Sequence, residues 1–458
     1  MSAFLAAMRD GRWLTRERIR LWALGLLAAS AIGIAFLVVT SDGRSDYQGR
    51  PLGTDFSNVY AAGTYVLNGK PAAAFDWPAQ YARERQIFGE QTPFYGWHYP
   101  PYFLFIAALL ALMPYGLALA VWQGATLLLY LLMVRAALSM SWPGLSRPFA
   151  SFSVGAAEDV DAGHVGERSD AVLRTAMAGR DGAARFPHDN FWIVLALAFP
   201  AVFVNIGHGH NGFLTAALIG AGLLILERRP IVSGILFGLM AYKPQFGVLI
   251  PLVLAATGRW RAFVAAGATV VALTLATLIA FGPEVWRAFF ASTHLTRVEV
   301  LELGGTGWHK IQSIFSIVRM WGGSIPLAYA AQGTLMLALA GALVWLWRSA
   351  AAYPLKAASL IVASLLATPY SLDYDFVALA PAIAFLAVDG FSRGFSPWQK
   401  SALAFAWFMP IIARTVAEHT LVPLGVPAML VVFVLVLARA ASDAGLITGW
   451  QSAAQPIK

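Results

Sequence analysis

The most regular feature of this chain is a series of long apolar runs separated by short polar connectors. Runs of about 15 to 25 hydrophobic residues recur, and a helix of that length crosses the roughly 30 Å hydrocarbon core of a bilayer. The pattern predicts an all-α polytopic membrane protein in which residues 1–458 form a single membrane domain. It indicates about 12 transmembrane helices, expected near residues 21–40, 117–138, 191–205, 213–226, 231–241, 246–256, 262–281, 326–347, 355–371, 376–391, 399–416 and 421–439.

The positions of arginine and lysine predict the orientation of these spans. Five arginines precede the first span, and Arg228, Arg259 and Arg348 fall on connectors of the same side. Because cytoplasmic connectors carry an excess of positive charge, we expect both termini to be cytoplasmic. Lys243 is the exception, since it lies alone on an outer connector.

Three segments between the spans are long enough to have structure or functions of their own. With this orientation, 41–114 and 282–325 are outer loops, and we expect the first of them to be the catalytic loop. Residues 102–113 are apolar but cover only about 18 Å as a helix, which predicts a juxtamembrane or re-entrant helix. The segment 72–88 is amphipathic and suits a helix at the membrane interface. Residues 139–190 are rich in small and charged residues and predict a flexible cytoplasmic insert.

Composition supports the membrane assignment and excludes several classes of chemistry. Hydrophobic residues make up 59% and charged residues 12% of the chain, against about 25% charged in soluble domains. The net charge of +8 is attributed to cytoplasmic Lys and Arg, so no nucleic acid partner is expected. With no cysteine present, disulfides, thiolate catalysis and Cys-ligated metal centres are excluded.

Nearly every unusual polar residue falls on the outer side, and this asymmetry predicts a chemical site at the outer interface. The expected spans carry almost no charge at mid-membrane, which argues against a channel or a proton-coupled carrier. The candidate residues are Asp55, Asn58, Tyr60, His98, Tyr99, His208, His210, Asn211, Lys243, Gln245, Trp308, His309, Lys310, Asp373 and Asp375.

Two of these residues suggest glycosyl transfer. Asp55 is a lone carboxylate among Tyr, Asn and Trp, and such a transfer needs one carboxylate to take the proton of the acceptor hydroxyl. An ordinary loop aspartate is the alternative. Lys243 at a hairpin apex could neutralise a leaving phosphate together with His309 or Lys310, with Gln245 as a neutral donor. The alternative for Lys243 is an interface lysine that reaches toward water.

The remaining candidates are open to two interpretations each. The spacing of His208, His210 and Asn211 is only a weak signal for a metal site. These residues fit better as contacts to a sugar or phosphate, or as a plain polar turn. The glycine-rich stretch that leads to Trp308, His309 and Lys310 suits a flap over a sugar or a flexible loop. The pair Asp373 and Asp375 could bind a cation or an acceptor, or cap a helix.

The order of several short motifs resembles glycosyltransferase family 87, also described as domain of unknown function 2029. This family includes polyprenol-phosphate-mannose-dependent α-mannosyltransferases. The motifs are Asp-Phe-x-x-Val-Tyr-x-Ala-Gly from Asp55, Tyr-Pro-Pro from Tyr99, Gly-His-Asn-Gly-Phe-Leu from Gly209, the Lys-Pro pair at Lys243, and Thr-Pro-Tyr-Ser-Leu-Asp-Tyr-Asp from Thr368. The chain departs from the family at His210, where a Gly-Gln-x-Asn or Gly-Gln-Asn pattern is usual.

The resemblance implies the GT-C fold and an enzyme of the bacterial inner membrane with its site facing the periplasm. It implies an inverting hexosyltransferase that moves mannose, or another hexose or pentose, from a polyprenyl-phosphate donor to a lipid or glycan acceptor. It further implies no cofactor and no metal, with Asp55 as the base, Lys243 in the Lys-Pro turn and His309 as a functional histidine. Membrane lipids are the other expected partner. The alternatives are a transporter or flippase of lipid-linked sugars, and a GT-C enzyme that glycosylates protein.

Overall fold

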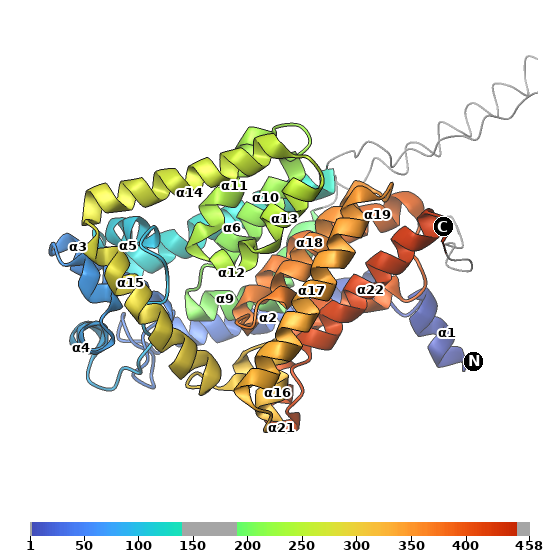
Figure 1. Cartoon of the computed structure of the whole chain (residues 1–458). Coiled ribbons are helices and arrows are strands. Elements are labelled where there is room, and N and C mark those ends of the chain that lie inside the picture. Colours follow the sequence, from blue (N-terminus) through green and yellow to red (C-terminus); the bar gives the residue numbers. More distant parts are fainter. Residues whose placement is uncertain (1, 140–189, 447–458) are drawn as a thin grey trace, which may run out of the picture.

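The computed structural model describes residues 2–139 and 190–446, and these residues are mostly helical (Figure 1). No strand forms among them, and their β pairing is limited to two isolated bridges, Ser45 with Pro51 and Ile311 with Leu372. The predicted all-α class is therefore confirmed for the described residues. Residues 140–189, which make up nearly all of the expected insert at 139–190, lie outside them.

Six helices within the described ranges are long and apolar enough to cross a membrane, so the chain is a polytopic membrane protein. A seventh span results if α8 (Phe191–Ala198) and α9 (Pro200–His208), which meet at a 53° bend, are counted as one. The six are α2 (Arg16–Val39), α6 (Tyr115–Ser139), α14 (Trp260–Phe281), α17 (Ile325–Arg348), α19 with its preceding 3-10 turn (Asp373–Arg393) and α22 (Gly425–Asp443).

Four further apolar helices are shorter than a full span, so the total of about 12 spans stays a prediction. Pro230 and Pro244 begin two of them and Pro354 follows the first residue of a third, where proline is tolerated, whereas Pro251 lies inside the helix that Pro244 begins. The four are α10 (Gly212–Ile225), α11 with a 3-10 turn (Pro230–Tyr242), α12 with α13 (Pro244–Gly247 and Leu249–Ala256) and α18 (Tyr353–Ala367).

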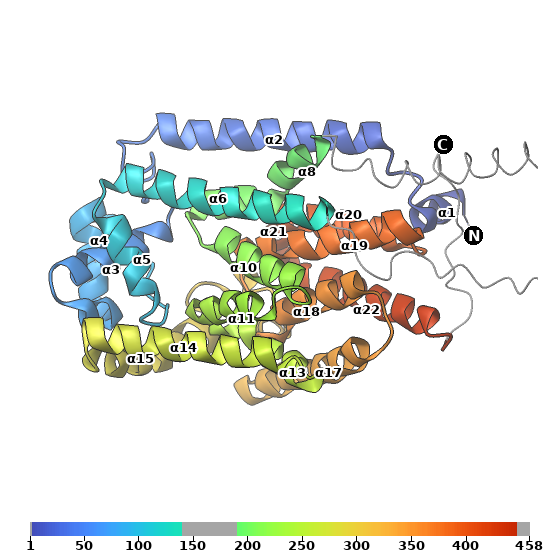
Figure 2. The same cartoon turned by 90° about the horizontal axis from the view of Figure 1, so that it is seen from above.

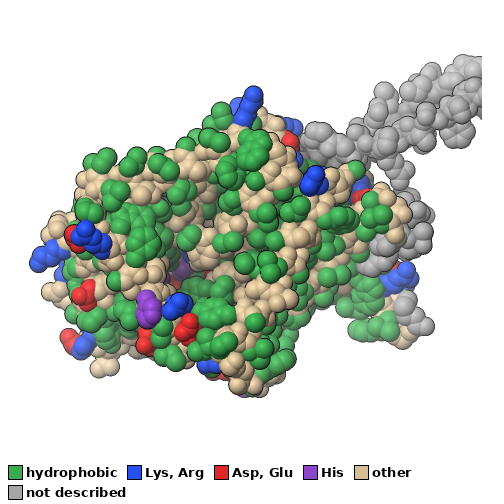
Figure 3. Space-filling view, in the orientation of Figure 1, with side chains coloured by type: hydrophobic (Ala, Val, Ile, Leu, Met, Phe, Trp, Pro, Cys, Tyr) green, Lys and Arg blue, Asp and Glu red, His purple; other side chains and the backbone are tan. Residues whose placement is uncertain are grey.

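The long helices lie side by side with their axes roughly along the long direction of the molecule (Figure 2). Seen from above, α2 and α6 follow one side and α14 the other, with α10, α18 and α19 between them (Figure 2). Most side chains of α2 and half of those of α14 are exposed, whereas nearly all of α18 is buried. On the visible face, charged side chains gather toward the lower left and the upper right, with a largely uncharged band between them (Figure 3). This distribution suits a molecule with its middle in lipid.

The single span expected over 399–416 is wrong. The structure has α20 (Gln399–Phe408), a 3-10 turn (Met409–Ile411) and a separate helix, α21 (Ala413–Thr420). Pro410 explains the break, because it has no backbone N–H to donate and its ring disfavours the helical conformation of the preceding residue. As a consequence, α21 leaves the helix bundle and joins the outer loops (Figure 1).

The first outer loop, 41–114, folds into a small helical layer at one end of the bundle. It contains α3 (Phe56–Leu67), a 3-10 helix (Pro71–Phe75), α4 (Trp77–Phe88) and α5 (Phe103–Ala111). The short helix expected over 102–113 and the helix expected over 72–88 are thus both present. Gly63 lets α3 and α5 approach closely, because a Cβ there would lie 2.0 Å from the carbonyl oxygen of Ala107.

The second outer loop, 282–325, is also structured. It comprises α15 (Glu284–Leu295), a π-helical turn (Thr296–Glu302), a 3-10 turn (Trp308–Lys310) and α16 (Ile314–Met320). Near the start of the chain, the short helix α1 (Ala3–Asp10) precedes the first span, α2.

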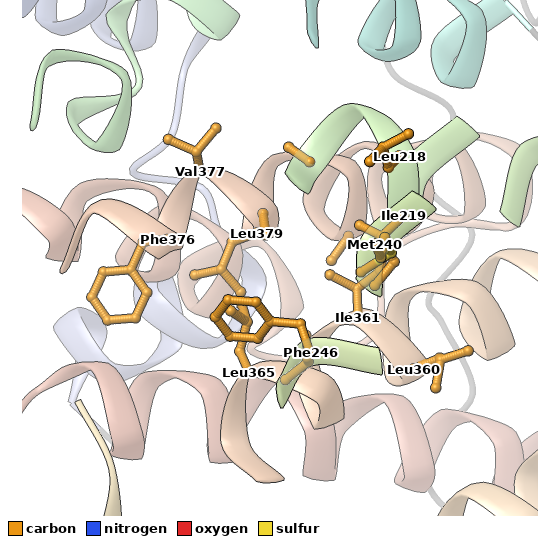
Figure 4. Close-up of a cluster of buried hydrophobic side chains, with 14 of the residues drawn as sticks. Leu218, Ile219, Met240, Phe246, Leu360, Ile361, Leu365, Phe376, Val377 and Leu379 are labelled. Carbon is orange, nitrogen blue, oxygen red and sulfur yellow. The ribbon is translucent and has the colours of Figure 1, made fainter. Parts of the chain in front are cut away.

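A buried hydrophobic cluster fixes the segments that carry the charged residues of the outer end (Figure 4). Met240 and Phe246 flank the Lys243 turn, and Phe376 follows Asp375 directly. These three side chains are at most 1% exposed, so the backbone on either side of both charged residues is held by close packing. The labelled members of the cluster are Leu218, Ile219, Met240, Phe246, Leu360, Ile361, Leu365, Phe376, Val377 and Leu379.

Candidate active site

Asp55 immediately precedes α3 and lies against the end of α9. Its backbone N–H donates to the carbonyl oxygen of His208 at 3.0 Å, and its Oδ1 lies 3.9 Å from His208 Nδ1. The same Nδ1 lies 2.8 Å from Thr54 Oγ1. The Asp55 side chain is 20% exposed, so a substrate can reach a carboxylate whose position is fixed by two chain segments.

The environment of Asp55 gives its carboxyl group the proton affinity of a base that works near neutrality. Burial raises the pKa of Asp55 to about 7, and the negative charge of Asp373 adds to the shift. The positive charges of Lys243, Lys310 and Arg414 oppose it. A general base is most effective when its pKa lies near the working pH.

The Gly-His-Asn turn after α9 is held by a side chain from within that helix. Asn205 Nδ2 donates to the carbonyl oxygen of His210 at 3.0 Å, and Asn205 Oδ1 accepts from the N–H of Gly212 at 2.8 Å. Gly209 has φ 61°, and a Cβ at this position would lie 2.6 Å from Phe56 Cβ. Only glycine fits such a left-handed position packed against a neighbour.

His210 and Asn211 are buried at this turn. The ring of His210 stacks on Tyr374 with centroids 3.6 Å apart, and its Nε2 lies 3.1 Å from the Tyr99 hydroxyl. Burial lowers the pKa of His210 well below its usual range, so the ring is neutral. His210 Nδ1 and both polar side-chain atoms of Asn211 have no hydrogen-bond partner among the described residues. Buried polar atoms without partners are costly and mark places where a ligand group can bind.

Lys243 is buried, which excludes the interpretation of a lysine reaching to water. It is 5% exposed, and its Nζ lies 2.6 Å from Asp375 Oδ1. The rings of Phe246 and Tyr374 each lie 5.5 Å from the same nitrogen. The second oxygen of Asp375 accepts the N–H of Leu372. The half-buried Gln245 lies one residue beyond the proline of this turn.

Asp373 connects the second outer loop to α21. Asp373 Oδ2 lies 2.8 Å from Nε of Arg414. The bridge between Ile311 and Leu372, together with a 2.7 Å bond from the Gln312 N–H to the Ser371 carbonyl, holds the loop next to Asp373. The neighbouring Lys310 is thereby brought into the electrostatic field of Asp373 and Asp55.

Trp308 and His309 line the wall of this loop. Trp308 donates a hydrogen bond from Nε1 to the carbonyl oxygen of Leu301. The Cζ atom of Arg319 lies over the Trp308 ring, 4.8 Å from its centroid. His309 and Trp308 border a hollow that Glu418 of α21 also lines. Partial burial lowers the pKa of His309, and Glu418 opposes that shift.

Three candidates lie in the first outer loop without a described contact to Asp55. His98 Nδ1 bonds Thr296 Oγ1 at 2.9 Å, and burial lowers the pKa of His98 to about 4. Tyr60 donates its hydroxyl to the carbonyl oxygen of Met113, and Asn58 is buried within α3. The bond of His98 joins this loop to the second one, and the bond of Tyr60 lies within the first.

Two residues of the site were missed by the sequence reasoning. Arg414 lay inside the wrongly expected span 399–416, where a charge should have pointed to function. Glu84, fully buried in α4, accepts hydrogen bonds from Gln80 and from the N–H of Tyr95, and burial raises its pKa to about 7. The alternation of charged and apolar residues in α4 gave no sign that Glu84 faces inward.

These features define a polytopic membrane protein with a charged site at one end of its helix bundle. A family model described as glycosyltransferase family 87 matches residues 97–369. The match covers more than half of the chain, so the protein belongs to glycosyltransferase family 87, and the expected resemblance is confirmed. Searches of curated proteins and of solved structures gave no match.

Family membership makes the protein a glycosyltransferase, which favours transfer over the transporter alternative. The matched segment contains His210, Asn211, Lys243 and Lys310, whereas Asp55 precedes it and Asp373 follows it. No group of three or more His, Cys, Asp or Glu that could hold a metal ion occurs among the described residues.

Proposed function

We propose that this protein transfers a sugar from a polyprenyl-phosphate donor to a lipid or glycan acceptor at the periplasmic face of the bacterial inner membrane. The observation that carries the proposal is the environment of Asp55, a partly exposed carboxylate with a pKa of about 7 and three cations acting on it. A base that accepts a proton near pH 7, beside positive charge for an anionic leaving group, suits this reaction.

Asp55 acts as the general base of a single displacement. Its carboxylate takes the proton of the acceptor hydroxyl while that oxygen attacks the anomeric carbon. The bond from the anomeric carbon to the phosphate oxygen breaks, and its electron pair leaves with the polyprenyl phosphate. Attack opposite the leaving group inverts the anomeric configuration, so a β-linked donor gives an α-linked product. Asp55 then returns the proton to the solvent.

The remaining residues bind and orient the substrates. His210 and Asn211 offer unpaired polar atoms near Tyr374, and these are suited to sugar hydroxyls. The Lys243 ammonium contributes positive charge close to Asp55 but is paired with Asp375, which makes it a positioning residue. His309 and Trp308 would cover the sugar from the second outer loop. The lipid chain would lie along the apolar helix α5.

The test uses the full-length protein in proteoliposomes with a panel of labelled polyprenyl-phosphate sugars. We expect at least one donor to be converted into a glycolipid or glycan whose new linkage is inverted. Label in protein would instead indicate protein glycosylation, and movement of donor across the bilayer without release of sugar would indicate transport. A nucleotide sugar used in place of the polyprenyl-phosphate donors would contradict the proposal.

A further inference from the structure

Three cations act on Asp55, and the structure distinguishes them by their existing partners. Lys243 is the most committed, because its buried ammonium pairs with Asp375 at 2.6 Å and is enclosed by Phe246 and Tyr374. Moving this lysine onto a substrate would leave Asp375 buried with an unpaired charge, which is strongly unfavourable. Direct contact with a phosphate is better suited to a cation that is not paired in this way.

Arg414 is such a cation. Its side chain is 34% exposed, and its closest contact with Asp373 is made by Nε, 2.8 Å from Oδ2. The Nε–H makes no hydrogen bond of adequate geometry with a described residue, and neither terminal nitrogen has a described partner. The planar fork of a guanidinium binds phosphate through two N–H groups at once, so Arg414 retains the groups needed to hold one.

Lys310 is the second uncommitted cation. It is half-buried, and no described hydrogen bond or ion pair involves its side chain. Burial and the like charge of Arg414 lower the pKa of Lys310, while Asp373, Asp55 and Glu418 oppose that shift. The pairing of Ile311 with Leu372 fixes this lysine beside the same carboxylates.

Two cations that repel each other while keeping free donors form a site for an anion. Asp373 Oδ2 lies 2.8 Å from Arg414 Nε, which leaves the two terminal nitrogens of the guanidinium for an anion. An incoming phosphate can bind these nitrogens and bridge Arg414 and Lys310 without displacing the buried Asp373.

We infer that Arg414 and Lys310 bind the phosphate group of the donor and hold it as it leaves, while Arg414 keeps Asp373 as its partner. This inference rests on the proposed function and assigns the phosphate contacts within it. As the glycosidic bond breaks and negative charge grows on the phosphate, these two donors stabilise that charge. Lys243 keeps its partner Asp375 throughout.

The test measures binding without chemistry, using the full-length protein in lipid nanodiscs. The probes are farnesyl phosphate, farnesol and inorganic phosphate. The wild type should bind farnesyl phosphate about a hundredfold more tightly than farnesol, because hydrogen bonds from each of the two cations to the charged phosphate are worth about tenfold. Inorganic phosphate should compete weakly, since it lacks the lipid chain. A phosphate site that binds inorganic phosphate as tightly as farnesyl phosphate would overturn the assignment to a lipid-linked donor.

The variants are Arg414→Gln, Lys310→Gln and the double substitution. Each single change should reduce the preference for farnesyl phosphate over farnesol by about tenfold, and the double variant should abolish it. Arg287→Gln on α15 is the matched control, because it removes a cation from an exposed pair with Glu284 and should change nothing. Arg414→Lys, which keeps the charge, should restore part of the preference and serves if Arg414→Gln does not fold.

An unchanged phosphate preference in the folded double variant would overturn the inference. So would a selective loss of that preference in Lys243→Met, with Arg414→Gln behaving as the wild type. Failure of the proposed function would look different, because the wild type would then bind farnesyl phosphate but transfer no sugar from any polyprenyl-phosphate donor.

Discussion

The Nζ of Lys243 lies 2.6 Å from Oδ1 of Asp375, and both side chains are buried. Removing one member of a buried ion pair leaves the other charge without compensation, at a cost of about 3 to 5 kcal/mol. We therefore expect Lys243→Met to lower the thermal unfolding temperature in detergent strongly. The double variant with Asp375→Leu should recover most of that stability while remaining impaired in transfer. A single variant as stable as the wild type would show that the pair does not hold the turn.

The rate of transfer should rise with pH through about 7. Asp55 must be ionised to accept a proton, and burial, followed by the charge of Asp373, raises its pKa to about 7. Asp373→Asn removes that charge, so the rising limb of kcat/KM should move to lower pH. Asp76→Asn is the control, since Asp76 caps α4 and is not among the groups that act on Asp55. A rising limb of kcat/KM at the same pH in Asp373→Asn as in the wild type would contradict the effect of Asp373 on the pKa of Asp55.

His98 should not take part in proton transfer. Its pKa is lowered to about 4 by burial, so the ring stays neutral across the pH range in which Asp55 titrates. His98→Gln and Thr296→Val each remove one partner of the same hydrogen bond, and each should cost about 1 kcal/mol of unfolding free energy. Both should retain the pH profile of the wild type. A profile that changes only in His98→Gln would give this histidine a catalytic role.

Asp55→Asn should stabilise the folded protein above neutral pH. A carboxyl whose folded pKa is raised from 3.8 to about 7 loses stability as the pH rises from about 4 to 7, because only the unfolded chain ionises freely. The loss reaches up to about 4 kcal/mol, since one pKa unit corresponds to about 1.4 kcal/mol. The variant should therefore match the wild type near pH 4 and unfold at a higher temperature at pH 8. Equal unfolding temperatures at pH 8 would show that Asp55 is not desolvated.

The sequence predicted those elements that depend on local pattern. The apolar runs at 21–40, 117–138 and 262–281 correspond to α2, α6 and α14 within a few residues, because a helix in lipid needs only length and hydrophobicity. The span expected over 399–416 failed because Pro410 outweighs the apolar composition around it.

Which site residues meet in space was harder to predict. Asp55 and Lys243 could be proposed as members of one site because the charge pattern predicts that both fall on the same side of the membrane. The pairing of Lys243 with Asp375 joins residues 132 positions apart, and no periodicity within a single sequence encodes such a contact. The pairing of Arg414 with Asp373 was hidden for the same reason, since the two residues lie on different elements.

The most direct test of the account is the rate of transfer by Asp55→Asn in proteoliposomes, with farnesyl phosphate binding measured in the same preparation. Asparagine keeps the size of the side chain but cannot take the acceptor proton. We predict a loss of transfer of at least about a hundredfold, as expected for removal of a general base, with phosphate binding unchanged. Transfer at the wild-type rate by Asp55→Asn would contradict the central claim.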